Sequence, residues 1–232
     1  MSLTAAEWGA VHLSLKVAAW GLAFSLPVAL GVAYLLARAR FPGKFLLDAL
    51  IHLPLVIPPV ATGYILLITF APNGAFGHWL ARTFGLVFAF RWTGAALAAA
   101  VMSFPMLVRP MRLSFEAVDR KLEDAAATLG ANRALVFLTI TLPLAMPGIL
   151  AGAILGFAKS LGEFGATITF VSNIPGETQT LALAIYSFLQ VPGAEPSAIK
   201  LTLLAIFISF LALIASEWVA RRLKAAIGMG HA

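Results

Sequence analysis

The sequence predicts an all-α polytopic membrane protein, a single domain with about five transmembrane helices. Of the 232 residues, 61% are hydrophobic and only 11% are charged. No soluble globular domain needs so much apolar surface, whereas repeated spans of about 20 apolar residues do. A β-barrel is disfavoured because its strands are segments of about 10 residues with alternating polarity, a pattern that this sequence lacks. Cysteine is absent, which excludes disulfides, thiolate metal sites and a cysteine nucleophile.

Five apolar runs are long enough to cross a membrane, in a domain that extends from about residue 9 to residue 222. The expected spans are about 9–37, 45–70, 93–108, 144–171 and 199–219. The first run is too long for the apolar core of a signal peptide and has no positive start, so we interpret it as an uncleaved helix. Three prolines interrupt the second run, where freed backbone carbonyls require neighbours or a water-lined cavity: Pro54, Pro58 and Pro59.

Two segments outside these spans are expected to form short helices. Residues 71–92 are typical of a loop with a short amphipathic helix and interfacial tryptophans, Trp79 and Trp92. The apolar stretch from Thr180 to Leu189 is too short to span the bilayer. A short helix that lies at the interface or dips into the membrane is therefore favoured there, with a sixth span as the alternative.

The basic residues predict the orientation in the membrane. With five spans, most of them fall on one side: Arg38, Arg40, Lys44, Arg109, Arg112, Arg120, Lys121, Arg133, Arg221, Arg222 and Lys224. The other side has Arg82, Arg91 and Lys200. The positive-inside rule then places the N-terminus outside and the C-terminus in the cytoplasm. The net charge of +6 is better explained by this orientation than by nucleic-acid binding. We expect membrane lipid, and no nucleic acid, to surround the chain.

A polar island interrupts the apolar sequence between the third and fourth spans, over about residues 119–142. It contains Arg120, Lys121, Glu123, Asp124 and Arg133. Three alanines and a leucine favour a short helix, and Gly130 is a natural stop for it. The pattern predicts a short amphipathic helix, a glycine turn, a second helical run from Arg133 to Thr141, and Pro143 at the opening of the next span. The island alone is equally compatible with a docking projection and with a connector that lies on the lipid headgroups.

The spacing within this island resembles the permease signature of ABC importers. The matching residues are Asp124, Ala125, Ala126, Gly130, Ile140, Leu142 and Pro143. The family usually has Glu where this chain has Asp124, so the charge is kept on a shorter side chain. The resemblance implies the ABC type-1 transmembrane fold, a homodimer, and a coupling loop that docks in a cleft of each of two cytoplasmic ATPase subunits. ATP and Mg²⁺ would then bind to the ATPase, and no cofactor to this chain, which has no GxxxxGK[ST] phosphate loop.

Other segments resemble the permeases of molybdate importers in particular. They are Phe41–Lys44, His52–Pro59, Ala98–Pro110 and Ser160–Thr180. This resemblance covers nearly the whole chain and implies a molybdate-binding protein on the periplasmic side of the bacterial inner membrane. A sulfate or tungstate permease is the alternative within the class. An ATP-independent anion channel or carrier is the alternative outside it, but would leave the polar island unexplained.

The fourth span contains a glycine stripe followed by two charges. Gly148, Gly152 and Gly156 recur every four residues, a small-xxx-small pattern that allows close helix packing. Lys159 and Glu163 continue the stripe and are spaced for an ion pair. The pair is interpreted either as a structural seal between helices, which is slightly favoured, or as part of a gate or pathway.

Hydroxyl groups near the outer end of this span are weaker pathway candidates. Ser160, Thr167 and Thr169 offer neutral donors that could pass a hydrated oxyanion without trapping it. The competing interpretation is that they bond to carbonyls of their own helices. No metal site or catalytic centre is expected, because His12, His52, His78 and His231 lack a ligand spacing and no nucleophile cluster can be assembled.

Overall fold

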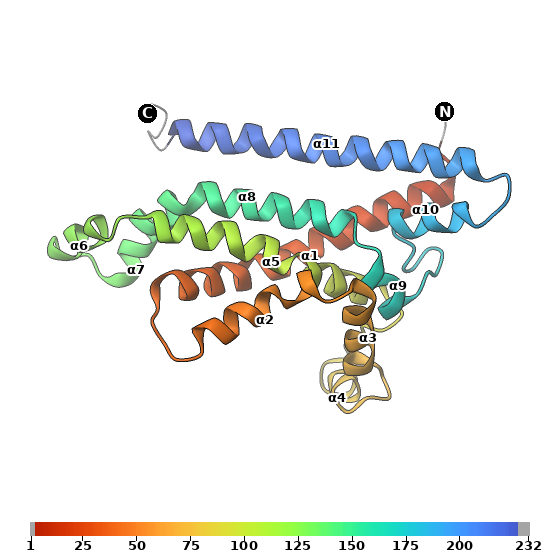
Figure 1. Cartoon of the computed structure of the whole chain (residues 1–232), viewed down its shortest axis with the longest axis horizontal. Helices are drawn as coiled ribbons and strands as arrows, with labels where there is room; N and C mark the ends of the chain where they lie inside the picture. The colour runs from red at the N-terminus through yellow and green to blue at the C-terminus, as the bar shows by residue number, and fades with distance from the viewer. Residues whose placement is uncertain (1–2, 227–232) are drawn as a thin grey trace.

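The computed structural model describes residues 3–226, and every regular element in that range is helical (Figure 1). Within the described residues, four helices are long and apolar enough to cross a membrane, and a sharply bent pair allows five. The all-α polytopic fold that the composition predicts is therefore confirmed. The span-forming elements are α1 (Ala5–Arg38), α2 (Lys44–Val56) with α3 (Pro59–Phe70), α5 (Trp92–Ala117), α8 (Leu142–Leu161) and α11 (Glu195–Ala226).

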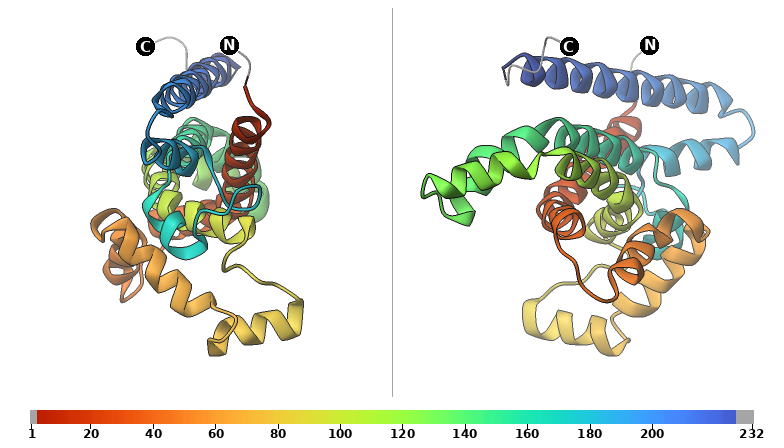
Figure 2. Two further views of the ribbon diagram at one scale, coloured as in Figure 1. Left: turned by 90° about the vertical axis from the view of Figure 1, so that its right-hand side faces the viewer. Right: turned by 60° about the vertical axis from the view of Figure 1, so that its left-hand side comes forward.

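Helices α1, α5 and α8 pack together and contain most of the core. Small side chains bring these helices close, since Ala29 and Ala33 of α1 and Ala98 and Ala99 of α5 are fully buried. In the most apolar window of α5, 61% of the residues are buried, against 11% in α11. α5 is therefore the central helix, whereas α11 lies along the outside of α8 and exposes large apolar side chains as lipid-facing helices do (Figures 1 and 2).

The second expected span, 45–70, is not one helix. α2 and α3 meet at an angle of 113°. Ile57, which precedes a proline, and Pro58 both have extended backbone conformations, and Pro59 begins α3. A residue before proline is pushed out of the helical region, and proline at the first helical position sacrifices no hydrogen bond. The Pro58–Pro59 pair therefore breaks the span rather than only kinking it.

The fourth expected span, 144–171, is also divided. α8 ends at Leu161, and a short helix, α9 (Gly165–Val171), follows after a three-residue break. Two glycines flank this break, Gly162 and Gly165, and glycine is a poor helix former. α9 packs against α3, so the second parts of the two divided spans form one unit (Figure 1).

The expected short helices are present as α4 (Ala75–Phe84) and α10 (Leu181–Leu189). At 1.5 Å per residue, the 9 residues of α10 extend about 14 Å, less than half of the roughly 30 Å hydrocarbon thickness. α10 is therefore too short to be a sixth span. It packs under the beginning of α11 and beside α1.

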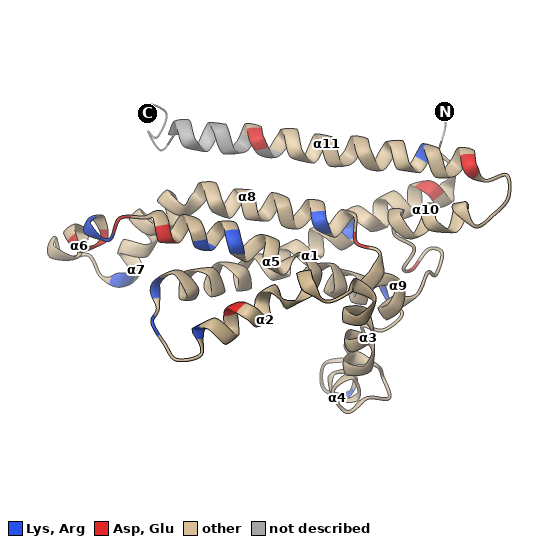
Figure 3. Ribbon diagram, in the orientation of Figure 1, with Lys and Arg blue, Asp and Glu red and all other residues tan. Residues whose placement is uncertain are grey.

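The polar island lies at the opposite end of the bundle from α9 and α10. It consists of α6 (Arg120–Thr128), α7 (Arg133–Val136) and the π-helical turn η1 (Phe137–Thr141), which leads into α8. Figure 1 shows α6 and α7 projecting beyond the end of α5, near the point where α1 ends. Arginine and lysine residues gather at this same end (Figure 3).

Candidate functional site

The first helix of the loop is defined by local caps. The Asp119 side chain accepts a hydrogen bond from the Lys121 amide at 3.0 Å, which satisfies a free donor at the start of α6. At the other end, Gly130 has φ +90°. The Ala131 amide donates to the Ala126 carbonyl at 3.1 Å and the Gly130 amide donates to the Ala127 carbonyl at 3.0 Å. This pairing is a Schellman turn, which favours glycine at the left-handed position.

The second helix of the loop is continuous with the membrane helix. Asn132 caps it by accepting from the Leu135 amide at 2.9 Å. The helix then runs without a break from Arg133 to Leu161. The sequence pattern predicts a new span that opens at Pro143, and this prediction is wrong because Pro143 lies inside a continuous helix. The π-turn η1 ends at Thr141, two residues before Pro143, which has no N–H to donate. The Leu142 amide donates to the Phe137 carbonyl.

The signature residues therefore occupy two places. Asp124, Ala125 and Gly130 are exposed on the projecting part of the loop, and Ala126 is half-buried. Ile140, Leu142 and Pro143 are half-buried at the root of α8, where Leu142 packs against the core. α6, all of which the structure describes, buries none of its residues. The loop thus presents an exposed helical face on a rigid membrane helix.

The glycine stripe of α8 faces α5. A Cβ on Gly152 would lie 2.7 Å from the Leu107 carbonyl oxygen, and a Cβ on Gly148 or Gly156 would overlap Ser114 or Leu107. Such close approach is what small residues allow between membrane helices. The stripe therefore serves as the packing surface between α8 and α5.

Glu163 does not continue the α8 stripe, because it lies beyond the end of that helix. Its Oε2 accepts from Lys159 Nζ at 2.8 Å, and its Oε1 accepts from the Ala166 amide at 3.0 Å. The Glu163 side chain is 2% exposed and the Lys159 side chain 34%. Glu163 thus caps α9 while it is paired with α8, so it bridges the break between the two helices.

The hydroxyl groups proposed for the pathway do not form one open surface. Ser160 Oγ donates to the Gly156 carbonyl at 2.9 Å, and Thr169 Oγ1 donates to the Gly165 carbonyl at 3.0 Å. The side chain of Thr167 is buried. Ser160 and Thr169 are thus bonded to their own helices, which is the ordinary role of such residues in membrane helices.

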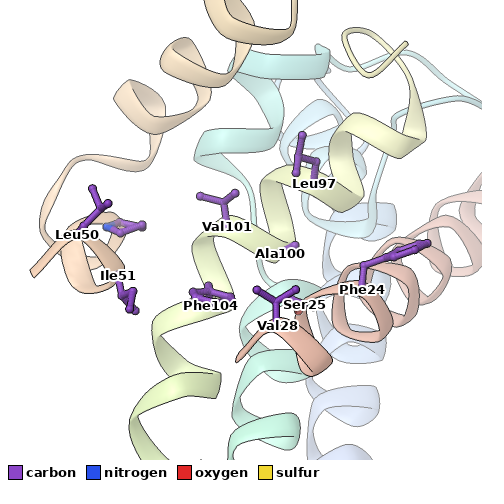
Figure 4. A pocket seen from close by; sticks show the side chains of 10 residues that line it. Phe24, Ser25, Val28, Leu50, Ile51, Leu97, Ala100, Val101 and Phe104 are labelled. Carbon is purple, nitrogen blue, oxygen red and sulfur yellow. The ribbon is translucent and has the colours of Figure 1, made fainter. Parts of the chain in front are cut away.

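Two cavities adjoin α2 and α5. The first has a volume of about 400 Å³ and is lined by side chains of α1, α2 and α5 that are apolar except for Ser25 (Figure 4). It offers no charged group to a hydrophilic anion. The second, of about 290 Å³, is lined by Asp48, His52, Arg109, Arg112, Leu113 and Glu116. Arg112 of α5 donates to Asp48 of α2 at 2.8 Å, which joins the two helices, and to Glu116 of its own helix at the same distance.

One cluster has no signal in the sequence and is formed by Arg38, Glu123 and Thr141. Arg38 and Glu123 are 85 positions apart, and their side chains meet at 2.9 Å. No local pattern signals such a contact. Within residues 3–226, no three histidine, aspartate or glutamate residues gather as a metal site would require. His231 lies outside the described residues.

Comparison with known proteins defines the class. The fold resembles the membrane subunit of a bacterial ABC transporter that imports alginate, with a TM-score of 0.72 over 95% of this chain and 80% of that chain, at 16% identity. Residues 25–225 match the family described as the binding-protein-dependent transport system inner membrane component. The fold is therefore that of an ABC type-1 transmembrane subunit. The chain belongs to that family and is a multi-pass inner-membrane permease.

Two relatives are similar over nearly their whole length. The molybdenum transport system permease protein ModB of Haemophilus influenzae is 56% identical over 97% of this chain and 98% of its own length. The protein of the same name from Escherichia coli K12 is 57% identical over 95% and 96%. The sulfate transport system permease protein CysT of Escherichia coli K12 is 42% identical over 68% of this chain and 57% of its own length.

Proposed function

We propose that this chain is the permease subunit of an ATP-driven importer that moves molybdate across the bacterial inner membrane. The two relatives named as molybdenum permeases support this substrate, because they match nearly the whole chain at 56% and 57% identity. The relative named as a sulfate permease matches at 42% over only 159 residues, which makes sulfate the weaker candidate. Tungstate shares the charge and tetrahedral shape of molybdate and is the second candidate substrate.

The observation that carries the proposal is the exposed loop. α6 projects from the bundle with Asp124 and Ala125 exposed, and Leu129 at its end is 89% exposed. An exposed leucine beside small residues and a carboxylate suits a partner with an apolar groove and a basic side chain. A self-sufficient channel or carrier would leave this projection unexplained.

The proposed assembly contains two copies of this chain with one pathway at their two-fold axis. Two cytoplasmic ATPase subunits dock on the α6 loops, and a periplasmic molybdate-binding protein delivers the substrate to the opposite end. ATP and Mg²⁺ bind to the ATPase subunits, and this chain performs no catalysis. The gathering of basic residues at the α6 end supports a cytoplasmic position for that end and an outside position for the N-terminus (Figure 3).

The test is uptake of radiolabelled molybdate into proteoliposomes that contain this chain, a cognate ATPase and a binding protein. We expect uptake only with ATP on the ATPase side, blocked by tungstate but not by excess sulfate. Uptake that ignores ATP would mean a channel or carrier. Inhibition by sulfate at concentrations equal to molybdate would mean a general oxyanion or sulfate permease.

The docking role of the loop is tested by charge reversal. Asp124→Lys should abolish ATP-dependent uptake while membrane insertion is unchanged, because the side chain is exposed and has no role in the bundle. Asp124→Glu is the matched control, since it restores the residue that is usual in the family. Normal uptake by the Asp124→Lys variant would exclude Asp124 from the docking surface.

A further inference from the structure

One carboxylate oxygen joins three segments of the chain. Glu123 Oε1, on α6, accepts a hydrogen bond from Arg38 Nη2 at 2.9 Å and from Thr141 Oγ1 at 2.6 Å. Arg38 is the last residue of α1, and Thr141 is the last residue of η1, directly before α8. The side chain of Glu123 therefore ties the projecting helix to two membrane helices at once.

The three side chains are largely withdrawn from solvent. Those of Arg38 and Glu123 are 12% and 20% exposed, and Thr141 is 1% exposed. The Arg38 Nη2 group also donates to the Val118 carbonyl at 3.1 Å, at the start of the loop. Charge-assisted hydrogen bonds in partly buried surroundings are stronger and more directional than exposed ion pairs. The cluster is therefore a stiff connection, unlike the exposed remainder of α6.

The π-turn sets the direction of Thr141. An extra residue in one turn rotates the preceding part of a helix by about 100° relative to an uninterrupted α-helix. η1 is a π-helical turn of this kind, and it ends at Thr141, whose hydroxyl donates to Glu123. The unusual turn therefore lies at the point where α8 is bonded to α6.

Aromatic packing holds the base of the cluster. Tyr34, one turn before Arg38 on α1, contacts Phe115 of α5 and Phe137 of η1 edge-on, with ring centroids 5.4 Å and 5.0 Å apart. Tyr34, Phe115 and Phe137 thus link α1 and η1, the two elements that Glu123 contacts, to each other and to α5. Arg38 and Thr141 therefore lie in packed helical segments and not at a flexible chain end.

We propose that Glu123 is the positioning residue that transmits movement of α6 into the membrane helices, with Arg38 and Thr141 as its receivers on α1 and α8. The inference rests on the proposed function, because it assigns these residues a role in the coupling of ATP hydrolysis to transport. Glu123 does not belong to the exposed docking face. Its carboxylate points to α1 and α8, whereas the neighbouring Asp124 is exposed.

The experiment compares Glu123→Gln and Thr141→Val with Glu116→Gln in the reconstituted transporter with its ATPase and binding protein. Glu116 is a matched control, since its carboxylate also pairs with an arginine at this end, but it bonds Arg112 and not the loop. The readouts are ATPase subunits retained per permease, basal ATP hydrolysis, and ATP hydrolysed per molybdate imported. A residue that only stabilised the fold would lower ATPase retention and basal hydrolysis together and leave the ATP used per imported molybdate unchanged.

We expect Glu123→Gln to retain the ATPase subunits and basal hydrolysis but to raise the ATP used per molybdate by at least about tenfold, within the usual range of coupling between sites. Thr141→Val should act in the same direction, and Glu116→Gln should match the wild type. The exchange Arg38→Glu with Glu123→Arg should recover part of the coupling that either single change loses.

Two results would overturn the inference: an unchanged ratio in Glu123→Gln, or loss of the ATPase subunits from that variant. The second would mean that Glu123 only keeps the loop folded. If the wild-type assembly showed no ATP-dependent uptake, the proposed function would fail and the inference with it. Coupled wild-type uptake with a fully coupled Glu123→Gln variant would remove the inference alone.

Discussion

Gly63 of α3 and Ala166 of α9 are in backbone contact. A Cβ on Gly63 would lie 2.8 Å from the Ala166 Cα and would overlap the Ala166 carbonyl oxygen. A second contact supports the first, because a Cβ on Gly165 would lie 2.7 Å from the Pro59 Cβ. The second halves of the two divided spans, α3 and α9, are thus in contact through glycines that lie just beyond each break. Movement at either break would therefore carry both halves together.

The α3–α9 contact predicts a sensitive position. Gly63→Ala should lower the free energy of unfolding by about 1–3 kcal/mol, because the added methyl group meets backbone that cannot turn aside. Gly31→Ala in α1 is the matched control, since a Cβ there meets nothing within 4 Å. Thermal unfolding of the purified chain in detergent measures the difference. Equal midpoints for the two variants would show that α3 and α9 are not closely packed.

The glycine stripe predicts a similar contrast on α8. Gly152→Ala should separate α8 from α5 and destabilise the fold by about 1–3 kcal/mol, because the methyl group would press on the Leu107 carbonyl oxygen. Gly162→Ala, in the open break after α8, should have little effect. The yield of monodisperse protein after membrane extraction and heating reports both. A stable Gly152→Ala variant would contradict the close packing of α5 and α8.

The turn of the loop predicts a coupling defect. Gly130→Pro should uncouple transport while insertion into the membrane is unchanged, because proline cannot adopt φ +90° and loses the amide that bonds to Ala127. Gly130→Asn is the milder control, since asparagine tolerates the left-handed region. ATP-dependent uptake and ATPase retention are the measurements. Full uptake by the proline variant would show that the angle between α6 and α7 is unimportant.

The Lys159–Glu163 pair predicts non-additive effects. Glu163→Gln should destabilise the chain by about 1–3 kcal/mol, because it removes a charged hydrogen-bond partner while Gln can still accept from the Ala166 amide. Adding Lys159→Met should recover part of this loss, since no unpaired charge then remains. Thermal unfolding of the single and double variants measures the coupling. Purely additive losses would mean that the ion pair has no role in bridging α8 and α9.

The helical loop could be predicted from the sequence because its determinants are local. Asp119 and Asn132 cap their own helices, and Gly130 supplies the left-handed turn within the same stretch of chain. The continuity of α7 with α8 could not be predicted, because proline at position 143 is typical of a helix start and nothing in the sequence indicates the π-turn before it. The Arg38–Glu123 contact could not be predicted from the sequence either, since it depends on how α1 and α6 are placed in space.

The sequence by itself determined that the chain is helical, that it crosses a membrane about five times, and where its exposed loop lies. These properties follow from the length of apolar runs and from capping residues, which act over one or two helical turns. Only the tertiary structure decided that two spans are divided, that α3 and α9 join at Gly63, and that Glu123 connects α6 to α1 and α8. Those features depend on which helices are neighbours. A helix break is stable only when another segment satisfies its free backbone groups, and a buried charge is stable only when another segment supplies a partner.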